Sequence, residues 1–308
     1  MRPYVALTPE ACGEVLLALR RGIEVFHRWG VPLPRRSWIQ EAQERLERAS
    51  ATASLGESDE DLRYISVAVA WAVDLYHIST CLGSEPSRRV AAELSRITRG
   101  SLVDRRDASV AKNYLSQFWV GALLAQSKLK PHILAYDVHG DSKPDFVVEC
   151  EGVKFAVEVK RPSKPSAALR AVHAAGDQIR DYDRPGIIIV DVTDCTTIDP
   201  WEITRERRPV RERVGEELNQ MHLRLSRLID TYTRSNKFHQ VTMLMTFARY
   251  WPWIVDSNPH RDAGLNFRAT SFSYRWSHQI IPLTRLIQER LLVGVEQLTG
   301  NRPSHSFY

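Results

Sequence analysis

The chain has 308 residues, of which 43% are hydrophobic and 26% are charged, a composition typical of a folded globular protein and not of a disordered one. Its four cysteines are far apart and show no CxxC spacing, so they indicate neither a zinc site nor a disulfide framework. The N-terminus lacks the pattern of a signal peptide, and the most apolar stretch, residues 64–73, ends at Asp74 and is too short to span a bilayer. We therefore expect a cytoplasmic protein with no membrane partner.

The positive charge is concentrated in the last third of the chain. The formal net charge is +5, and residues 200–308 hold 16 basic and 10 acidic residues, whereas residues 1–110 are neutral overall. Such a surplus favours a polyanionic partner such as nucleic acid, although many mildly basic proteins bind none.

The first hundred residues show helical patterns. Apolar residues recur at helical spacing after a Thr8-Pro9 start, and this pattern stops at Gly30. Further helices are predicted over residues 37–49 and 61–82, and another after the next proline. These N-terminal helices are compatible with homodimerisation, with substrate gating or with docking of a partner protein.

The pattern changes near residue 105, where the polar segment RGSLVDRRD is a candidate domain boundary. We predict a helical N-terminal region over residues 1–105 and a second domain over residues 106–308. In the second domain a helix is followed by short β-type runs, another helix and a further apolar strand. A long amphipathic helix, a strand and a closing helix broken near Pro282 follow. This order predicts an α/β (α+β) fold with a mixed central sheet flanked by helices.

Residues 143–162 have the sequence KPDFVVECEGVKFAVEVKRP, which predicts a β-hairpin. We expect its turn at Glu151-Gly152, because glycine supplies the positive φ that a two-residue loop needs. This register places Asp145 directly opposite Glu158.

The two faces of this hairpin differ in character. Because successive side chains alternate between faces, one face is apolar and can pack a core, whereas Asp145, Glu158 and Lys160 share the other face. Carboxylates on opposed residues, with Cβ atoms roughly 5 Å apart, repel each other and destabilise a sheet. A divalent cation such as Mg²⁺, which prefers hard oxygen ligands, would offset that repulsion. The plain alternative is that these residues form the solvent face of a half-buried sheet.

Pro144-Asp145, followed after the short hairpin by Glu158-Val159-Lys160, resembles the motif of the PD-(D/E)XK nuclease superfamily, which has the restriction-endonuclease-like fold. The triplet alone is a weak signal, because short acidic-x-Lys sequences are common. The strand context and the turn that brings the two acidic residues into register make it more specific.

The surroundings of the motif strengthen the resemblance, which covers roughly residues 107–194. Gln178 and Tyr182 form a Q-x-x-x-Y pair on the following helix that resembles the exonuclease-like, RecB-type branch of the superfamily. Separated by four residues, they share one helix face. The first helix of this region departs from many members because it carries no acidic residue, which puts a second metal site in doubt.

The resemblance implies a metal-dependent nuclease that hydrolyses phosphodiester bonds, with DNA favoured over RNA. Asp145 and Glu158, with the backbone carbonyl of Val159, would hold Mg²⁺, for which Mn²⁺ could substitute. The cation would activate the attacking water. Lys160 would orient that water or the scissile phosphate.

Four further residues would contact the substrate in an enzyme of this kind. Gln178 and Tyr182 would line the groove, and Arg161 and Lys164 would bind the phosphate backbone. The alternative is a catalytically inactive protein that keeps the fold and serves as a nucleic-acid-binding or protein-interaction module, because a fold does not by itself imply its chemistry.

Overall fold

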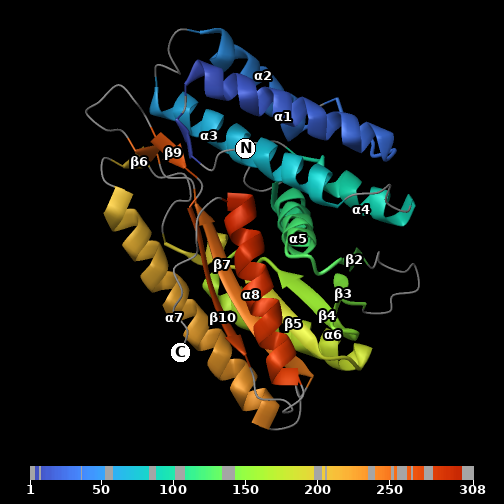
Figure 1. The fold of residues 1–308 in the computed structure, drawn as a ribbon. Coiled ribbons are helices and arrows are strands. Elements are labelled where there is room, and N and C mark those ends of the chain that lie inside the picture. The colour runs from blue at the N-terminus through green and yellow to red at the C-terminus, as the bar shows by residue number, and fades with distance from the viewer. Residues whose placement is uncertain are drawn as a thin grey trace. The chain divides into compact units, whose positions relative to one another are not determined.

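The structure is a computed structural model. It describes residues 4–6, 8–35, 37–52, 58–82, 88–100, 108–133, 143–197, 203–204, 207–234, 240–250, 253–254, 262–264, 266–273 and 280–299. Over these ranges the chain is a mixed α/β protein with two separate sheets (Figure 1). Within the same ranges, no helix is both long and apolar enough to cross a membrane.

The chain forms two compact units, each assembled from segments that are distant in the sequence. The first unit comprises residues 1–122, 199–210 and 250–266, and the second comprises residues 123–198, 211–249 and 267–308. The predicted division into residues 1–105 and 106–308 stays a prediction.

Helices α1 (Pro9–Arg28), α2 (Trp38–Ala51) and α3 (Asp59–Cys81) pack against one another in the first unit (Figure 1). They confirm the predicted helices to within two residues at each end. The Thr8 hydroxyl caps α1 by accepting the Ala11 N–H at 3.2 Å. Helix α3 is buried without a break over residues 65–75, as expected for a helix that is apolar all round.

Further elements complete the first unit. Helix α4 (Arg88–Ile97) is joined to α2 by the Trp38 indole N–H, which donates to the Ile97 carbonyl. Most of α5 (Ala108–Gln126) also belongs here. A small sheet in the order β1-β9-β8-β6 was not predicted, because it pairs the first residues of the chain with segments beyond residue 200. Its strands are β1 (Tyr4–Ala6), β6 (Ile203–Thr204), β8 (Trp253–Ile254) and β9 (Asp262–Gly264).

The second unit is built on a six-stranded mixed sheet in the order β10-β7-β5-β4-β3-β2. Strands β2, β3 and β4 are antiparallel, whereas β4, β5 and β7 are parallel, which confirms the mixed sheet expected from the sequence. The strands are β2 (His132–Ile133), β3 (Phe146–Cys150), β4 (Val153–Lys160), β5 (Gly186–Asp191), β7 (Val241–Tyr250) and β10 (Asn266–Ser273).

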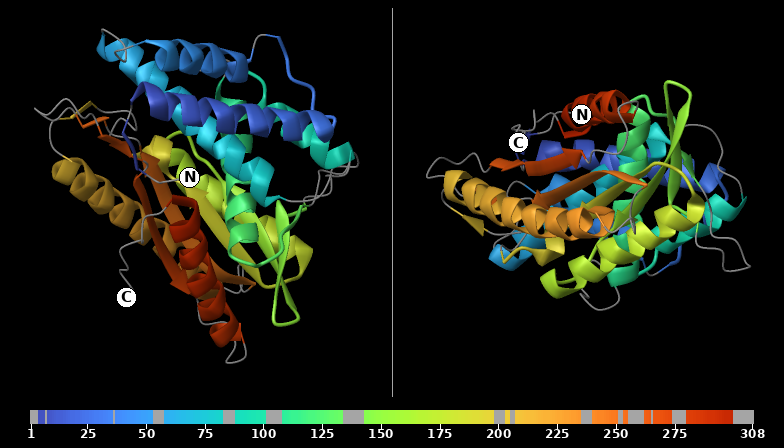
Figure 2. Two further views of the ribbon diagram at one scale, coloured as in Figure 1. Left: turned by 45° about the horizontal axis from the view of Figure 1, so that its top comes forward. Right: turned by 90° about the horizontal axis from the view of Figure 1, so that it is seen from below.

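Helices cover both faces of this sheet. In the right-hand view of Figure 2, α6 (Pro165–Tyr182) and α7 (Arg207–Arg234) lie on one face and α8 (Ile280–Thr299) on the other. The expected break near Pro282 is corrected: α8 starts two residues before this proline and continues to its end. Proline is tolerated in the first turn because its missing N–H has no partner there.

The motif hairpin has the predicted turn and register. Glu151 and Gly152 have φ values of 47° and 80°, the two positive values of a type I′ turn. Phe146 pairs with Val157 and Cys150 with Val153, so the register continues to Asp145 opposite Glu158.

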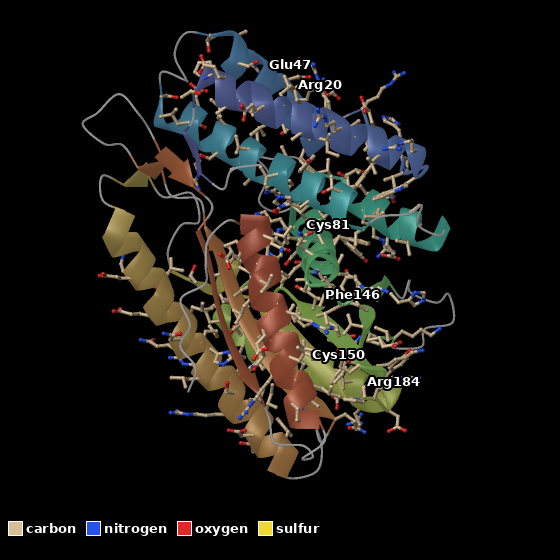
Figure 3. The ribbon with its side chains drawn as sticks, viewed as in Figure 1. Arg20, Glu47, Cys81, Phe146, Cys150 and Arg184 are labelled. Atoms are coloured by element: carbon tan, nitrogen blue, oxygen red, sulfur yellow. The ribbon has the colours of Figure 1, made fainter. Side chains whose placement is uncertain are left out.

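One face of the hairpin packs a core, as predicted, and it includes the fully buried Phe146 and Cys150 (Figure 3). The middle of the opposite face of β4 is buried as well, because α6 packs on it and leaves Ala156 and Glu158 with no exposed surface. The alternative of a solvent face therefore fails for Glu158.

Helix α6 approaches the start of β5 so closely that only glycine fits at Gly186. A Cβ atom there would lie 2.2 Å from Cγ2 of the fully buried Ile179. We expect Gly186→Ala to lower the free energy of unfolding by about 1–3 kcal/mol through overpacking, measured by urea denaturation. Gly215→Ala in α7 is the matched control: its Cβ would meet nothing within 4 Å, and it should be neutral or stabilising. Equal effects of the two substitutions would contradict this packing.

Candidate functional site

Asp145 lies immediately before β3 and reaches across to β4. Its Oδ2 accepts a hydrogen bond from the Val159 backbone N–H at 2.8 Å. In an antiparallel pair, the amide and carbonyl of one residue face the same neighbouring strand, so the Val159 carbonyl is directed to the same side as its N–H. The three groups expected to bind metal, which are the Asp145 and Glu158 carboxylates and the Val159 carbonyl, therefore lie at neighbouring positions of the hairpin.

Glu158 lies near the end of β4 on the face covered by α6, and it is 0% exposed. Its Oε2 accepts a hydrogen bond from Lys160 Nζ at 2.6 Å. Its Oε1 is buried and has no hydrogen-bond partner among the described residues. A buried carboxylate oxygen without a partner is costly, because its desolvation is not offset by a contact.

Burial raises the pKa of Glu158 to about 8, and the nearby charge of Asp145 contributes in the same direction. Lys160 opposes both effects and favours the ionised form. When Glu158 ionises, the Asp145 and Glu158 carboxylates therefore share a region in which Lys160 is the cation in contact with Glu158.

Lys160 and Gln178 meet although they are on different elements. Lys160 Nζ donates to Gln178 Oε1 at 2.7 Å, so the second strand of the hairpin and α6 converge on the same ammonium. The structure therefore brings together four predicted site residues, Asp145, Glu158, Lys160 and Gln178, along with the backbone of Val159.

Tyr182 and Lys164 have other surroundings. Tyr182 is the last residue of α6, is half-buried, and has the Arg184 guanidinium 5.7 Å from its ring centroid. Lys164 is exposed just before the first turn of α6, where its side chain caps no backbone N–H. Their predicted contacts with substrate stay predictions.

Arg161 is directed at protein carboxylates. Its side chain is only 9% exposed, and it bonds Asp194 through two nitrogens at 3.0 and 3.3 Å. A third nitrogen lies 3.3 Å from the fully buried Asp191. These contacts tie the end of β4 to the segment after β5, and the predicted phosphate contact stays a prediction.

This ionic network extends to a third strand and was not predicted from the sequence. Arg249, at the end of β7, lies 3.5 Å from the same Asp191 carboxylate, and its backbone N–H donates to the Thr193 hydroxyl at 3.0 Å. The available signal was the segment VDVTD, in which acidic residues follow a continuous apolar strand. Parallel strands have their carboxyl ends at the same edge of the sheet, so charged residues at the carboxyl ends of β4, β5 and β7 meet there.

The donor set fits a divalent cation of the Mg²⁺ type. Among the described residues there is no group of three or more His, Cys, Asp or Glu side chains suited to a metal. Mg²⁺ commonly uses only one or two carboxylates and takes its remaining ligands from water and phosphate. Asp145 and Glu158 meet that requirement, and the buried Oε1 of Glu158 has a lone pair to offer.

Comparison of the chain with family models, with curated proteins and with solved structures found no match.

Proposed function

We propose that the chain is a metal-dependent nuclease of the PD-(D/E)XK type that hydrolyses phosphodiester bonds, with DNA as the preferred substrate. The observation that supports this most strongly is the convergence on Lys160. Its ammonium contacts both Glu158, the buried acidic residue of the motif, and Gln178, which lies on a separate helix. Ordinary surface charges would face the solvent, and they would not be buried and hydrogen-bonded to one another in this way.

The arrangement of elements also supports a restriction-endonuclease-like core for the second unit. The hairpin β3–β4 carries the motif, α6 crosses over one face, and β5 returns parallel to β4. The helix that carries Gln178 is thereby packed on the strand that carries Glu158.

In this proposal Asp145, Glu158 and the Val159 carbonyl would hold Mg²⁺, or Mn²⁺ in its place. The bound cation supplies Lewis-acid chemistry that activates water and offsets the negative charge developing on the phosphate. Lys160 donates to the attacking water or to a phosphate oxygen, and Gln178 fixes the direction of its ammonium. The bond from Val159 N–H holds Asp145 against β4.

The exposure of each predicted substrate-binding side chain indicates whether it is available to contact nucleic acid. Lys164 is exposed near the end of the motif strand and is available to a phosphate, and the half-buried Tyr182 is available for stacking or hydrogen bonding. Arg161 is already engaged by two carboxylates, so we assign it to the support of the strand end.

Cleavage assays test this proposal. The purified chain, incubated with plasmid, linear duplex, single-stranded DNA and RNA, should cleave DNA with Mg²⁺ or Mn²⁺ and not with EDTA. Lys160→Ala should reduce the rate by about 10²–10³-fold, as expected when one polar group that acts in the transition state is removed. Lys154→Ala, an exposed lysine on the same strand, is the matched control and should retain activity. Cleavage of no substrate, with nucleic-acid binding unchanged by Lys160→Ala, would instead indicate an inactive binding module.

The metal site has a separate test in thermal unfolding. Asp145→Asn should leave the metal-free protein at least as stable as the wild type, because it removes a repulsion and its amide oxygen can still accept the Val159 N–H. It should also abolish the rise in unfolding temperature that Mg²⁺ causes in the wild type. A marked loss of stability in EDTA would contradict the proposed environment of Asp145.

A further inference from the structure

Lys160 lies between a buried carboxylate and the solvent. Its side chain is 21% exposed, whereas the Glu158 side chain that it contacts at 2.6 Å is 0% exposed. The ammonium also donates a hydrogen bond to Gln178 Oε1 at 2.7 Å. A lysine cannot accept a hydrogen bond, so the amide oxygen of Gln178 must be the atom that faces it.

The ammonium compensates a charge that would otherwise be costly to bury. Glu158 is desolvated and has Asp145 nearby, and both effects disfavour its ionised form. A partner charge held within hydrogen-bond distance reduces that penalty. When Glu158 is ionised in the metal-free protein, Lys160 therefore has the electrostatic role that a cation would have.

A divalent cation on Glu158 would compete with that ammonium. Both would lie within a few ångströms of each other beside a buried carboxylate, where like charges repel far more strongly than in water. A dication held by Oε1 would draw on the same single negative charge as the ammonium on Oε2, so the contact between Lys160 and Glu158 would lose most of its electrostatic stabilisation. Gln178 is a neutral acceptor on a different element, so its contact with Lys160 can persist when the contact between Lys160 and Glu158 is lost.

We propose that Lys160 is the internal counter-ion of Glu158, that a divalent cation displaces it, and that Gln178 is the positioning residue that retains the displaced ammonium beside the site. The displacement rests on the proposed function, because it requires a cation at Asp145 and Glu158. The arrangement keeps the affinity for free metal low. A bound phosphate would offset the repulsion between the ammonium and the metal ion, so it should promote metal binding.

Calorimetric titration at pH 8 of Mn²⁺ and of Mg²⁺ into the EDTA-treated, dialysed full chain, without nucleic acid, tests the displacement. Lys160→Met should bind either metal more tightly than the wild type, by about tenfold or more, because the competing charge is gone. Lys160→Arg keeps the charge and should bind metal as weakly as the wild type. Equal or weaker binding by Lys160→Met would overturn the proposal.

The role of Gln178 has its own readout. Gln178→Leu removes an acceptor that would hold the ammonium after displacement, so displacement becomes harder and metal affinity should fall. In the Lys160→Met background the same substitution should have little effect on metal affinity, since no ammonium remains to be held. An equal effect in both backgrounds would show that Gln178 acts only through general packing and would overturn its assignment.

The counter-ion contact can be measured without metal. In EDTA at pH 8, Lys160→Met should lower the free energy of unfolding, and most of that loss should disappear when Glu158→Gln is also present. Additive effects would overturn the counter-ion role. The proposed metal site is judged separately: it stands if the wild type binds Mn²⁺ and Asp145→Asn does not. Absence of binding in the wild type and in Lys160→Met alike would overturn both the metal site and the displacement.

Discussion

Glu158→Gln should stabilise the metal-free protein, and the gain should grow as the pH rises from 5 to 8. The pKa of Glu158 is about 8 in the folded protein and 4.5 for the unperturbed group, so between these values the folded state holds a proton that the unfolded state has released. The free energy of unfolding of the wild type therefore falls through this interval and levels off above it. Glutamine does not titrate, and its amide oxygen can still accept from Lys160.

Urea denaturation in EDTA at several pH values measures this effect. We expect the difference between the variant and the wild type to increase on the order of 3 kcal/mol between pH 5 and pH 8. The matched control is Glu149→Gln, an exposed carboxylate of the same hairpin that pairs with Lys154, and it should change stability by less than about 0.5 kcal/mol. Parallel pH profiles for Glu158→Gln and the wild type would contradict the buried state of this carboxylate. Under the proposed function, Glu158→Gln also loses metal-dependent cleavage, so it is more stable and inactive.

Arg161→Met should destabilise the protein by about 3–5 kcal/mol, because it leaves the fully buried Asp191 with one fewer cation and removes both bonds to Asp194. Arg161→Lys keeps the charge without the two-pronged geometry and should show an intermediate loss. Lys164→Met, three residues further on and exposed, is the matched control and should change stability little.

The same variants decide between two roles for Arg161. If it stabilises the fold, the loss appears in denaturation of the free protein. If it serves chiefly as a phosphate contact, Arg161→Met would leave unfolding unchanged and weaken DNA binding with a reduced dependence on salt. The contacts with Asp191 and Asp194 favour the first outcome.

The motif hairpin was predictable in detail because its determinants are local. A glycine at the second turn position and strict alternation of apolar residues specify the turn, the register and the buried face, and the structure has all three. The helices α1, α2 and α3 were predictable for the same reason, since periodicity and the Thr8 cap act within a few residues.

Burial was the feature of the site that the sequence could not predict. The alternation of side chains predicts which residues share a face, but not what covers that face. The polar face of β4 could have been exposed to solvent; instead α6 packs on it, and burial turns Glu158 from a surface carboxylate into one with a pKa of about 8. The same packing brings Gln178 to Lys160, a contact between residues 18 positions apart.

Local features of this protein follow from the amino-acid sequence alone: the helices α1, α2 and α3, the turn at Glu151-Gly152, and a register that sets Asp145 against Glu158. The full burial of Glu158, the contact of Lys160 with Gln178, and the binding of Arg161 to Asp191 and Asp194 depend instead on the tertiary fold. The physical reason is the distance along the sequence over which each effect acts. Turn and periodicity preferences depend on neighbouring residues, whereas desolvation and ion pairing depend on the elements that the completed sheet brings together.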